Sequence, residues 1–550
     1  MRPDQRLAQR LRRGRRLLTA VVLGALTLSG CGAAHHSAGP GQSTTTLAPP
    51  SPPPPPVGEL SYALDGVPPR NWNVLAAAGD SPSLTQIADQ LWPSVFNVGP
   101  SFVPSLNAAL VTSASVTSES PQTVVYNLNP AATWSDGVPI SGEDFVYNWR
   151  AQSGQRGFSD VGGKAFSPAS TAGYSQVSSV DVAASEPDVV VVHFSTPDPD
   201  WESLFSHLIP AHVADQIGFD SGFTDPVADL VSGGAYIVQS YTPGGALRLV
   251  RNPSYAGPRG TALALDFDFV PYQPQAVAAL TANQVSCATV AATASTLLPL
   301  QSVKSLSVHV AGGPAYLDLD FREGSGPLAS RTVRAAISDA VDRQSASTAV
   351  LGAVMPGATP VSNRFFVPGE PGYADQAPAQ PSVADLHRPS RSVSLRLIVG
   401  SDPLSAAAAR EVASEVRSAG FTVTVVPVAS VPVAEAGQGW DMAIEVRSLG
   451  PFPGAATGTY LAGSPRDVDG FESAAASALI HRAASTSGAA RLADIDALDG
   501  LAWKDDVDVP LFAVPIAVAC QASVVNVAAN PAPQGPAYNA QVWGLASGAT

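Results

Sequence analysis

One sixteen-residue stretch is the most informative in this chain: Trp134-Ser135-Asp136-Gly137-Val138-Pro139-Ile140-Ser141-Gly142-Glu143-Asp144-Phe145-Val146-Tyr147-Asn148-Trp149. It follows residues 123–128, whose apolar pattern predicts a strand. Ser135-Asp136-Gly137 is typical of a turn, because glycine adopts positive φ at no steric cost. We therefore predict that the chain reverses direction here.

The second half of the stretch predicts a helix. Ser141 suits the N-cap position, and Asp144 lies three residues later, where a capping box places its acidic member. Phe145 and Trp149 are spaced to lie on one helical face, so we expect that face to be buried. The whole stretch thus predicts a strand, a turn and a capped helix.

A second pattern indicates a parallel sheet in the later part of the chain. Residues 395–399 are predicted to form a strand, and apolar residues at helical spacing over 404–419 predict a helix that ends at Gly420. Residues 421–425 alternate between apolar residues and threonine, as a half-buried strand does. A strand, helix and strand of this length predict a parallel pair with a right-handed crossover.

These motifs resemble those of the family 5 extracellular solute-binding proteins, the oligopeptide and dipeptide receptors of ABC importers. The similarity rests on the Trp134–Trp149 stretch and on three further segments: Arg251-Asn252-Pro253-Ser254-Tyr255, the helix over 331–343, and Asp508-Val509-Pro510-Leu511-Phe512. The resemblance implies an α/β fold, a bilobed periplasmic-binding-protein-like clamp of the large type with an inserted subdomain. Within it, Trp134, Ser135, Asp136, Gly137, Asp144 and Phe145 have a structural role.

The resemblance also implies domain boundaries. Lobe I is expected to comprise residues 58–100, 228–312 and 508–550, with the inserted subdomain over 101–227. Lobe II is expected over 313–507. Hinge closure of the two lobes would enclose a ligand.

The N-terminus predicts export and lipid anchoring. Residues 1–30 combine seven arginines with an apolar segment that is too short to span a membrane, as in a signal peptide. Leu28-Ser29-Gly30-Cys31 is similar to a bacterial lipobox, in which the cysteine is acylated, for example with palmitate. We expect a lipid-anchored protein on the extracytoplasmic face of the cell membrane. Both the general and the twin-arginine export routes remain open.

Composition excludes several classes of function. Residues 31–57 are rich in Ser, Thr and Pro and predict a disordered stalk.

Removing the predicted signal peptide, with its seven Arg and one Asp, takes the net charge of the chain from −15 to −21. This balance argues against nucleic-acid binding and against a broad contact with anionic lipids. Abundant Ala, Val and Pro fit a GC-rich genome such as that of an actinobacterium.

The ligand contacts are expected near the strand that begins at Asp441. In peptide-binding members of the family, this strand carries an aspartate that pairs with the ligand's α-amino group. Here the matching position is near Gly450, and no acidic residue lies between Arg447 and Gly463. Arg447 could face an anionic or polyhydroxylated ligand, or be a solvated residue at a strand end. The candidate ligand-binding residues are Arg447, Ser448 and Trp440.

The sequence predicts binding without catalysis. It contains no Walker A loop, dinucleotide fingerprint or zincin helix, so we predict no catalytic residues, no metal and no cofactor. Asp505, Asp506 and Asp508 are interpreted as a solvated turn. Cys287 and Cys520 are far apart in sequence, and a disulfide between them is left open.

Two functions follow. The first is a monomeric, lipid-anchored receptor that binds a peptide or another small polar solute for an ABC permease and its ATPase. The alternative is a non-transport glycolipid-binding or regulatory lipoprotein in phosphatidylinositol mannoside or lipoglycan assembly. It is suggested by Ile209–Val213 and Pro368–Tyr373, which are similar to segments of mycobacterial glycolipid-binding lipoproteins.

Overall fold

A computed structural model describes residues 58–271, 273–368, 370–381, 393–462, 471, 473–532 and 534–546. The predicted signal peptide, Cys31 and the predicted stalk lie outside the described residues, so those assignments stay predictions. None of the helices in the described ranges has the length and apolar character needed to cross a membrane.

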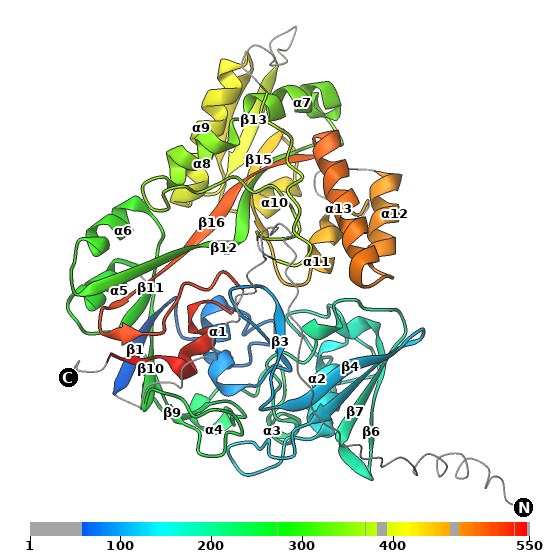
Figure 1. Cartoon of the computed structure of the whole chain (residues 1–550), viewed down its shortest axis with the longest axis vertical. Coiled ribbons are helices and arrows are strands. Elements are labelled where there is room, and N and C mark those ends of the chain that lie inside the picture. Colours follow the sequence, from blue (N-terminus) through cyan, green and yellow to red (C-terminus); the bar gives the residue numbers. More distant parts are fainter. Residues whose placement is uncertain are drawn as a thin grey trace, which may run out of the picture. The chain divides into compact units, whose positions relative to one another are not determined.

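A ten-stranded mixed sheet runs through the described body (Figure 1). Strands β13, β14 and β15 form one end of the sheet, and strands β1 and β8–β11 form the other. The two long strands between them, β12 and β16, lie side by side. In spatial order, the strands are β14 Thr422–Pro427, β13 Ser394–Val399, β15 Met442–Ser448, β12 Leu306–Phe321, β16 Asp508–Gln521, β11 Cys287–Val290, β1 Glu59–Asp65, β10 Ala264–Val270, β9 Ala246–Arg251 and β8 Tyr236–Tyr241.

The long strands β12 and β16 connect the two lobes. The beginning of β12 pairs with the end of β16, opposite Gln521, while its last residues pair with both β16 and β15. A register shift lies between Gly312 and Tyr316, where the chain passes from one half to the other. We use lobe I for the half with β1 and β8–β11, and lobe II for the half with β13–β15.

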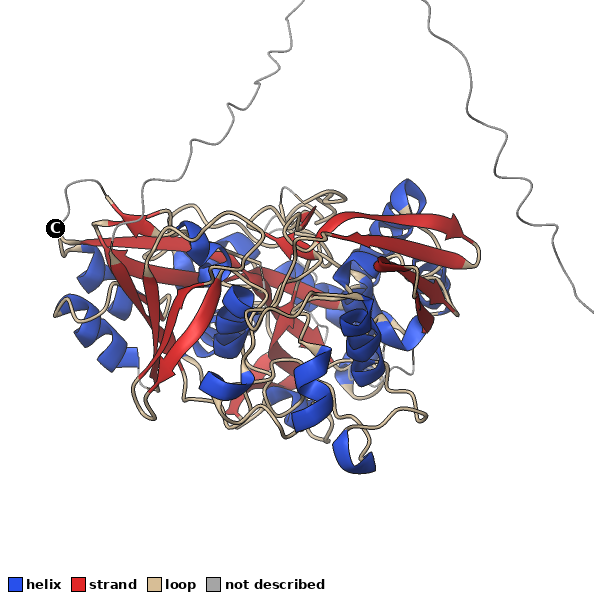
Figure 2. Cartoon of the chain, turned by 90° about the horizontal axis from the view of Figure 1, so that it is seen from below, coloured by secondary structure: helices blue, strands red, loops and turns tan. Residues whose placement is uncertain are grey.

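Helices are interspersed with the strands, as Figure 2 shows. The helices are α1 Pro82–Leu91, α2 Gly142–Gln152, α3 Ala211–Ile217, α4 Pro226–Asp229, α5 Gln273–Thr281, α6 Ala294–Gln301, α7 Arg331–Ala340, α8 Arg343–Leu351, α9 Pro403–Ser418, α10 Val431–Glu435, α11 Gly454–Thr457, α12 Ala474–Ala483 and α13 Gly488–Asp505. The 3-10 turns are η1 Val161–Gly163, η2 Tyr174–Gln176, η3 Trp201–Ser203, η4 Pro327–Ala329, η5 Gly458–Tyr460 and η6 Pro536–Val542. Short strand pairs are β2 Phe96–Val98 with β3 Pro104–Leu106, and β17 Val524–Val525 with β18 Gly544–Leu545.

A separate four-stranded sheet carries the stretch from Trp134 to Trp149. Its spatial order is β4 Val111–Glu119, β5 Gln122–Leu128, β7 Glu186–Phe194 and β6 Val177–Ala183, all antiparallel. The predicted strand is β5, and the predicted helix is α2, which begins after Ser141. Gly137 has φ +90°, as the turn requires. These three predictions are confirmed.

Asp144 organises this turn from inside the fold. Its side chain is buried and accepts hydrogen bonds from Ser141 N at 2.9 Å, Ala211 N at 2.8 Å and Trp134 Nε1 at 3.3 Å. Trp134 and Phe145 are fully buried. Burial raises the pKa of Asp144, and the backbone donors at Ser141 and Ala211 oppose that effect. The capping box is therefore confirmed and also joins the turn to α3.

The predicted strand–helix–strand unit is confirmed in lobe II. Strands β13 and β14 are parallel neighbours, and α9 connects them. Asp402 caps α9 by accepting a hydrogen bond from Ser405 N at 2.8 Å. Gly420 follows the helix with φ +104°, the left-handed region that favours glycine at a helix end.

The cysteine pairing that the sequence leaves open is a disulfide. Cys287 on β11 and Cys520 on β16 face each other in antiparallel register, and their sulfur atoms are bonded. The bridge therefore links a strand of lobe I to the long strand β16. No regular sequence spacing reveals it, because the two residues are 233 positions apart.

Candidate ligand-binding cleft

A cavity of about 440 Å³ lies in lobe II, beside Tyr316 of strand β12 and the last residues of strand β15. Tyr316 comes from β12, Glu435 from α10 and Tyr460 from η5, whereas Arg364 lies in the segment between α8 and β13. The cavity is lined by Tyr316, Arg364, Pro432, Glu435, Glu445, Val446, Arg447, Ser448, Ala455, Ala456, Thr459 and Tyr460. Four of the lining residues are charged: Arg364, Glu435, Glu445 and Arg447.

Arg447 is surrounded by carboxylates rather than exposed. Its Nε donates to Asp318 Oδ2 at 2.8 Å, its guanidinium also contacts Asp320, and Glu445 lies 3.6 Å away. Only 11% of its side chain is exposed. Antiparallel pairing causes this arrangement, because Arg447 lies opposite Tyr316 and Glu445 lies opposite Asp318. The charge of Arg447 is therefore already matched inside the protein.

A second buried guanidinium, that of Arg364, lies beside the first. Its Nε donates to Asp508 Oδ1 at 2.6 Å and its Nη1 donates to Asp499 Oδ1 at 3.0 Å. The Tyr460 hydroxyl donates to Asp508 Oδ2 at 2.6 Å. Although burial opposes ionisation of Asp508, Arg364 and Arg447 hold the pKa of its carboxyl below its usual value.

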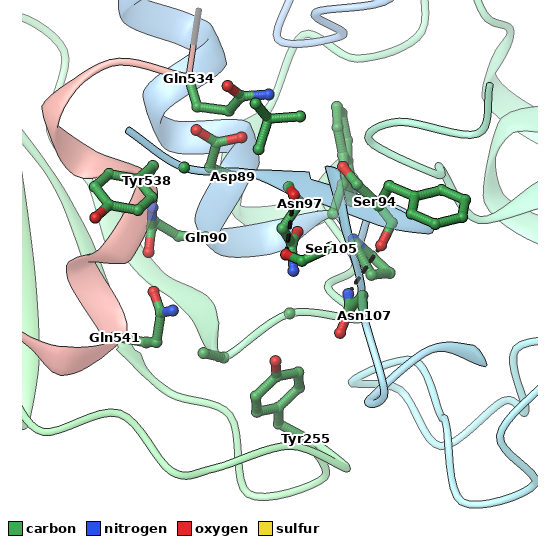
Figure 3. Close-up of a pocket in the computed structure, with 17 residues that line it drawn as sticks. Asp89, Gln90, Ser94, Asn97, Ser105, Asn107, Tyr255, Gln534, Tyr538 and Gln541 are labelled. Carbon is green, nitrogen blue, oxygen red and sulfur yellow. Dashed lines mark hydrogen bonds between the residues drawn. The ribbon is translucent and has the colours of Figure 1, made fainter. Parts of the chain in front are cut away.

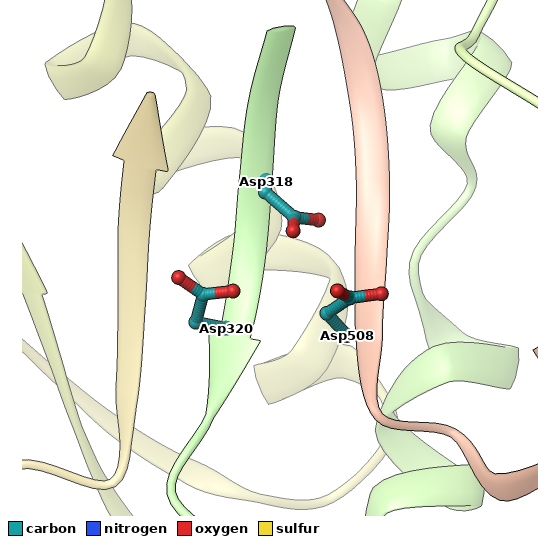
Figure 4. Close-up of side chains that lie close together, drawn as sticks. All are labelled: Asp318, Asp320 and Asp508. Atoms are coloured by element: carbon teal, nitrogen blue, oxygen red, sulfur yellow. The ribbon is translucent and has the colours of Figure 1, made fainter. Parts of the chain in front are cut away.

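The interpretation of Asp508 as part of a solvated turn is wrong. Asp508 begins β16 in the middle of the sheet and is only 2% exposed, whereas Asp505 and Asp506 end the preceding helix and are partly exposed. Figure 4 shows Asp318 and Asp320 projecting from β12 beside Asp508 on β16. A carboxylate cluster is therefore present, with two members from a strand that the sequence analysis did not consider.

The cluster carries more acid than base. Arg364 and Arg447 face six carboxyl groups, those of Asp318, Asp320, Glu435, Glu445, Asp499 and Asp508. Burial and the charge of Asp320 raise the pKa of Glu435 to about 8 and that of Glu445 to about 9. Burial and the neighbouring carboxylates of Asp508 and Asp320 raise the pKa of Asp318 well above its usual value. Raised pKa values favour the protonated, neutral forms of Asp318, Glu435 and Glu445, so the excess of acid is only partly ionised near neutral pH.

Two sets of these carboxylates are close enough to share a cation. One is Asp318, Asp320 and Asp508, and the other is Asp320, Glu435 and Glu445, with one oxygen of each residue within 4.8 Å of the others. In the first set, Arg364 and Arg447 already neutralise the oxygens. The second set includes Glu435, which makes no ion pair among the described residues. The prediction that no metal is bound stays a prediction.

A larger cavity, of about 490 Å³, lies between lobe II and the four-stranded sheet region of lobe I. One wall comes from residues 172–203 and the other from α11, α12 and α13. Ala455 on α11 lines both this cavity and the lobe II cavity. The two cavities therefore adjoin at α11, and together they form a cleft with contributions from both lobes.

An ion pair and a backbone hydrogen bond, both made by Asp200, cross this cleft; we call these two contacts the clasp. Arg491 on α13 donates from Nη1 to Asp200 Oδ1 at 2.6 Å, and Gly454 N donates to Asp200 Oδ2 at 3.0 Å. Both charged side chains are mostly buried. A Cβ at Gly454 would lie only 2.5 Å from Asp200 Oδ2, so a larger residue there would displace the Asp200 carboxylate. Asp200 thus connects lobe I to two elements of lobe II.

Replacing Asp200 with asparagine is expected to loosen the clasp. The neutral side chain loses the charge-assisted bond to Arg491, which removes about 1–3 kcal/mol of interlobe contact. We expect hydrogen exchange at the Gly454 amide to accelerate about tenfold or more, measured by mass spectrometry of peptides over 451–460. Asp188→Asn, an exposed position on β7, is the matched control and should leave that exchange unchanged. Equal protection of Gly454 in Asp200→Asn and wild type would contradict the clasp.

A third cavity, of about 210 Å³, lies within lobe I (Figure 3). Amide and hydroxyl side chains line it, among them Gln90, Asn97, Asn107, Gln534 and Tyr538. Asp89 lies at its wall, and its Oδ1 is 2.7 Å from His207 Nε2. This cavity contains polar groups but no excess of charge comparable with that in lobe II.

The predicted ligand-binding residues occupy different environments. Arg447 and Ser448 line the lobe II cavity, and Ser448 is exposed. Trp440 is 2% exposed, packs in a small core with Ile398, Val431 and Ala443, and does not line the cavity. Whether these residues contact a ligand stays a prediction. Sequence reasoning missed Asp318, Asp320, Glu435 and Glu445, although two acids alternating with apolar residues over 317–321 were a visible signal.

Comparison with known proteins identifies a family. Residues 105–468 match the model described as bacterial extracellular solute-binding proteins, family 5 Middle. The oligopeptide-binding protein OppA of Mycobacterium tuberculosis is 28% identical over 382 residues, which cover 66% of this chain and 61% of that relative. The chain therefore spans less than two thirds of the length of this curated relative.

Two other similarities cover different shares of the chain. The probable monoacyl phosphatidylinositol tetramannoside-binding protein LpqW of Mycobacterium tuberculosis is 34% identical over 156 residues, 28% of this chain and 22% of that protein. The solved structure of a periplasmic EDTA-binding protein, EppA, aligns with a TM-score of 0.78 at 26% identity, covering 92% of this chain and 99% of EppA. The predicted α/β fold of the periplasmic-binding-protein type is confirmed. These relatives are solute-binding proteins rather than enzymes.

Proposed function

Because the chain belongs to the bacterial extracellular solute-binding proteins of family 5, we propose that it captures a polar, peptide-like solute between its lobes and delivers it to an ABC-type importer. The observation that carries this proposal is the cleft formed where the lobe II cavity adjoins the interlobe cavity at Ala455. Closure of such a cleft couples ligand capture to a change in the surface that a permease would contact.

The proposal includes the lipid anchor at Cys31 and the predicted boundaries of the two lobes and the inserted subdomain. Acylation of Cys31 would hold the body near the membrane, where a permease and its ATPase operate. The predicted ranges for lobe I, the inserted subdomain and lobe II are retained as proposals. The similarity to OppA supports a peptide-like solute. No catalytic step is included.

A second candidate function is glycolipid binding without transport. The similarity to LpqW over 156 residues supports it, although it covers only 28% of this chain. In this case the cleft would take the headgroup of a mannosylated phosphatidylinositol, whose phosphate would need a cationic partner. Arg364 and Arg447 are the cations that line the lobe II cavity, and both are already paired with carboxylates. The charge of the cavity therefore favours the first candidate.

Native mass spectrometry of gently purified protein tests the proposal. Wild type is expected to retain a small adduct, and Ala455→Trp is expected to lose it because the indole would occupy the junction of both cavities. Ala475→Trp, at an exposed position on α12, is the matched control and should retain the adduct. A peptide adduct supports the transport function, and a phosphoinositol mannoside adduct supports the second candidate. Failure to retain any solute, or an identical adduct in Ala455→Trp, would contradict both.

A further inference from the structure

We propose that the lobe I cavity of Figure 3 is a second binding site, which takes one ring of a neutral sugar. The site lies apart from the cleft of the proposed function, because the lobe I cavity shares no described lining residue with the lobe II cavity or the interlobe cavity. Closure of the lobes is therefore not needed to form it.

The lining of this cavity is polar but almost uncharged. The end of α1, the β2–β3 hairpin and η6 all contribute to it. Nine of its lining residues carry an amide or a hydroxyl side chain, and these are labelled in Figure 3 together with Asp89, the one carboxylate in the described lining. Asn97 on β2 and Ser105 on β3 are exposed, so a solute can enter from that side.

Two buried oxygens of the lining residues lack a hydrogen-bond partner within the described part of the chain. They are Oδ2 of Asp89 and Oε1 of Gln534. Only 9% of the Asp89 side chain is exposed, and its other oxygen already lies 2.7 Å from His207 Nε2. A buried acceptor without a donor is costly, so both oxygens favour a ligand that donates hydrogen bonds.

Other polar side chains of the lining are held in place by the fold. Asn107 Nδ2 donates to the backbone oxygen of Ser94 at 2.9 Å, and Gln90 Nε2 donates to that of Ala537 at 2.8 Å. The second of these bonds connects α1 to η6 and so fixes two sides of the cavity relative to each other. Side chains fixed in this way lose little conformational freedom when a ligand binds.

Aromatic side chains supply the apolar part of the lining. Trp92, Phe96, Tyr255 and Tyr538 all contribute to it. Trp92 is 2% exposed, and its Nε1 donates to Val231 O at 3.1 Å, so the indole is held in one orientation. A sugar ring has apolar C–H faces and polar hydroxyl edges, and it therefore suits a lining that combines aromatic rings with amides.

The charge and the size of the cavity narrow the class of ligand. No lysine or arginine is among the described residues that line it, so a phosphate or carboxylate would lack a cationic partner there. The single carboxylate, that of Asp89, is already engaged by His207. A sugar hydroxyl both donates and accepts hydrogen bonds and needs no opposite charge. The volume of about 210 Å³ is on the scale of one sugar ring rather than of an oligosaccharide.

Calorimetry and saturation-transfer NMR of the intact chain with matched sugars test this site. The probes are glucose, galactose and mannose, with the corresponding uronates and amino sugars as charged counterparts. At least one neutral sugar is expected to bind about tenfold or more tightly than both of its counterparts. Gln534→Leu is expected to weaken that binding about tenfold without lowering the melting temperature, because it removes a buried acceptor that has no partner. Gln284→Leu, at an exposed position after α5, is the matched control and should bind the sugar as wild type does.

A second variant keeps the test decisive if Gln534→Leu does not fold. Tyr255→Phe retains the ring at the cavity and removes only the hydroxyl, so it should weaken sugar binding about threefold or more at an unchanged melting temperature. No binding of any neutral sugar, tighter binding of a charged counterpart, or wild-type affinity in both variants would overturn the inference.

The variant Ala455→Trp distinguishes this site from the cleft. It fills the junction of the other two cavities, and it should bind the neutral sugar as wild type does. Loss of sugar binding in Ala455→Trp would place the sugar in the cleft. That result would overturn the second site and leave the proposed function standing.

Discussion

Replacing Arg364 with leucine lowers the free energy of unfolding by about 3–5 kcal/mol, because it leaves two buried acids without their cation. Arg364 is 1% exposed and bonds to both Asp499 and Asp508. Its guanidinium also lies 4.0 Å from the centroid of the Trp503 ring. The variant therefore loses the ion pairs with Asp499 and Asp508 and the cation–π contact with Trp503. Thermal and urea unfolding of the intact chain measure the change.

Controls separate this effect from a general loss of charge. Arg482→Leu removes an arginine that pairs with Asp494 at the surface, and its melting temperature should stay close to that of wild type. Adding Asp499→Asn to Arg364→Leu should recover part of the loss, since one uncompensated carboxylate is then gone. If Arg364→Leu unfolded at the same temperature and urea concentration as wild type, the buried ion pairs of Arg364 would not stabilise lobe II as described.

Replacing Trp134 with alanine is expected to cost a similar amount, about 3–5 kcal/mol, by opening a cavity in lobe I. The indole is fully buried, and its Nε1 donates to Asp144 Oδ2 at 3.3 Å. A Cβ built at Gly233 would lie 3.1 Å from the Trp134 ring, which indicates how closely the backbone packs there. The variant thus loses packing and one donor to a buried carboxylate.

Urea unfolding and hydrogen exchange test the Trp134 prediction. The backbone amides of helix α2 should lose their protection from hydrogen exchange first, because Asp144 in the first turn of α2 accepts a hydrogen bond from Trp134. Val138→Ala lies in the same turn, where Val138 is 39% exposed, and should change stability little. Equal stability of Trp134→Ala and Val138→Ala would contradict the view that this stretch anchors the fold.

Local sequence patterns predicted most of the fold for physical reasons. The capping box at Ser141 and Asp144 involves residues three positions apart, so its geometry is encoded locally. The unit formed by β13, α9 and β14 is likewise visible from periodicity. The disulfide could not be predicted in this way, because Cys287 and Cys520 meet only through the pairing of β11 with β16.

The candidate site was predicted less completely, because it depends on long-range strand pairing. Arg447 was identified, but its partner Asp318 is 129 positions earlier in the sequence and reaches it through the β12–β15 register. Glu435 comes from a short helix with no motif of its own. Asp508 lies next to a polar helix end, which hid the fact that it begins a central strand. Local reasoning therefore found a cavity residue but not the charge of the cavity.

A crystal structure of the protein with its co-purified solute tests the central claim most directly. The account predicts solute density in the cleft at Ala455, in contact with residues of both the lobe II cavity and the interlobe cavity. Density confined to the lobe I cavity of Figure 3 would contradict it.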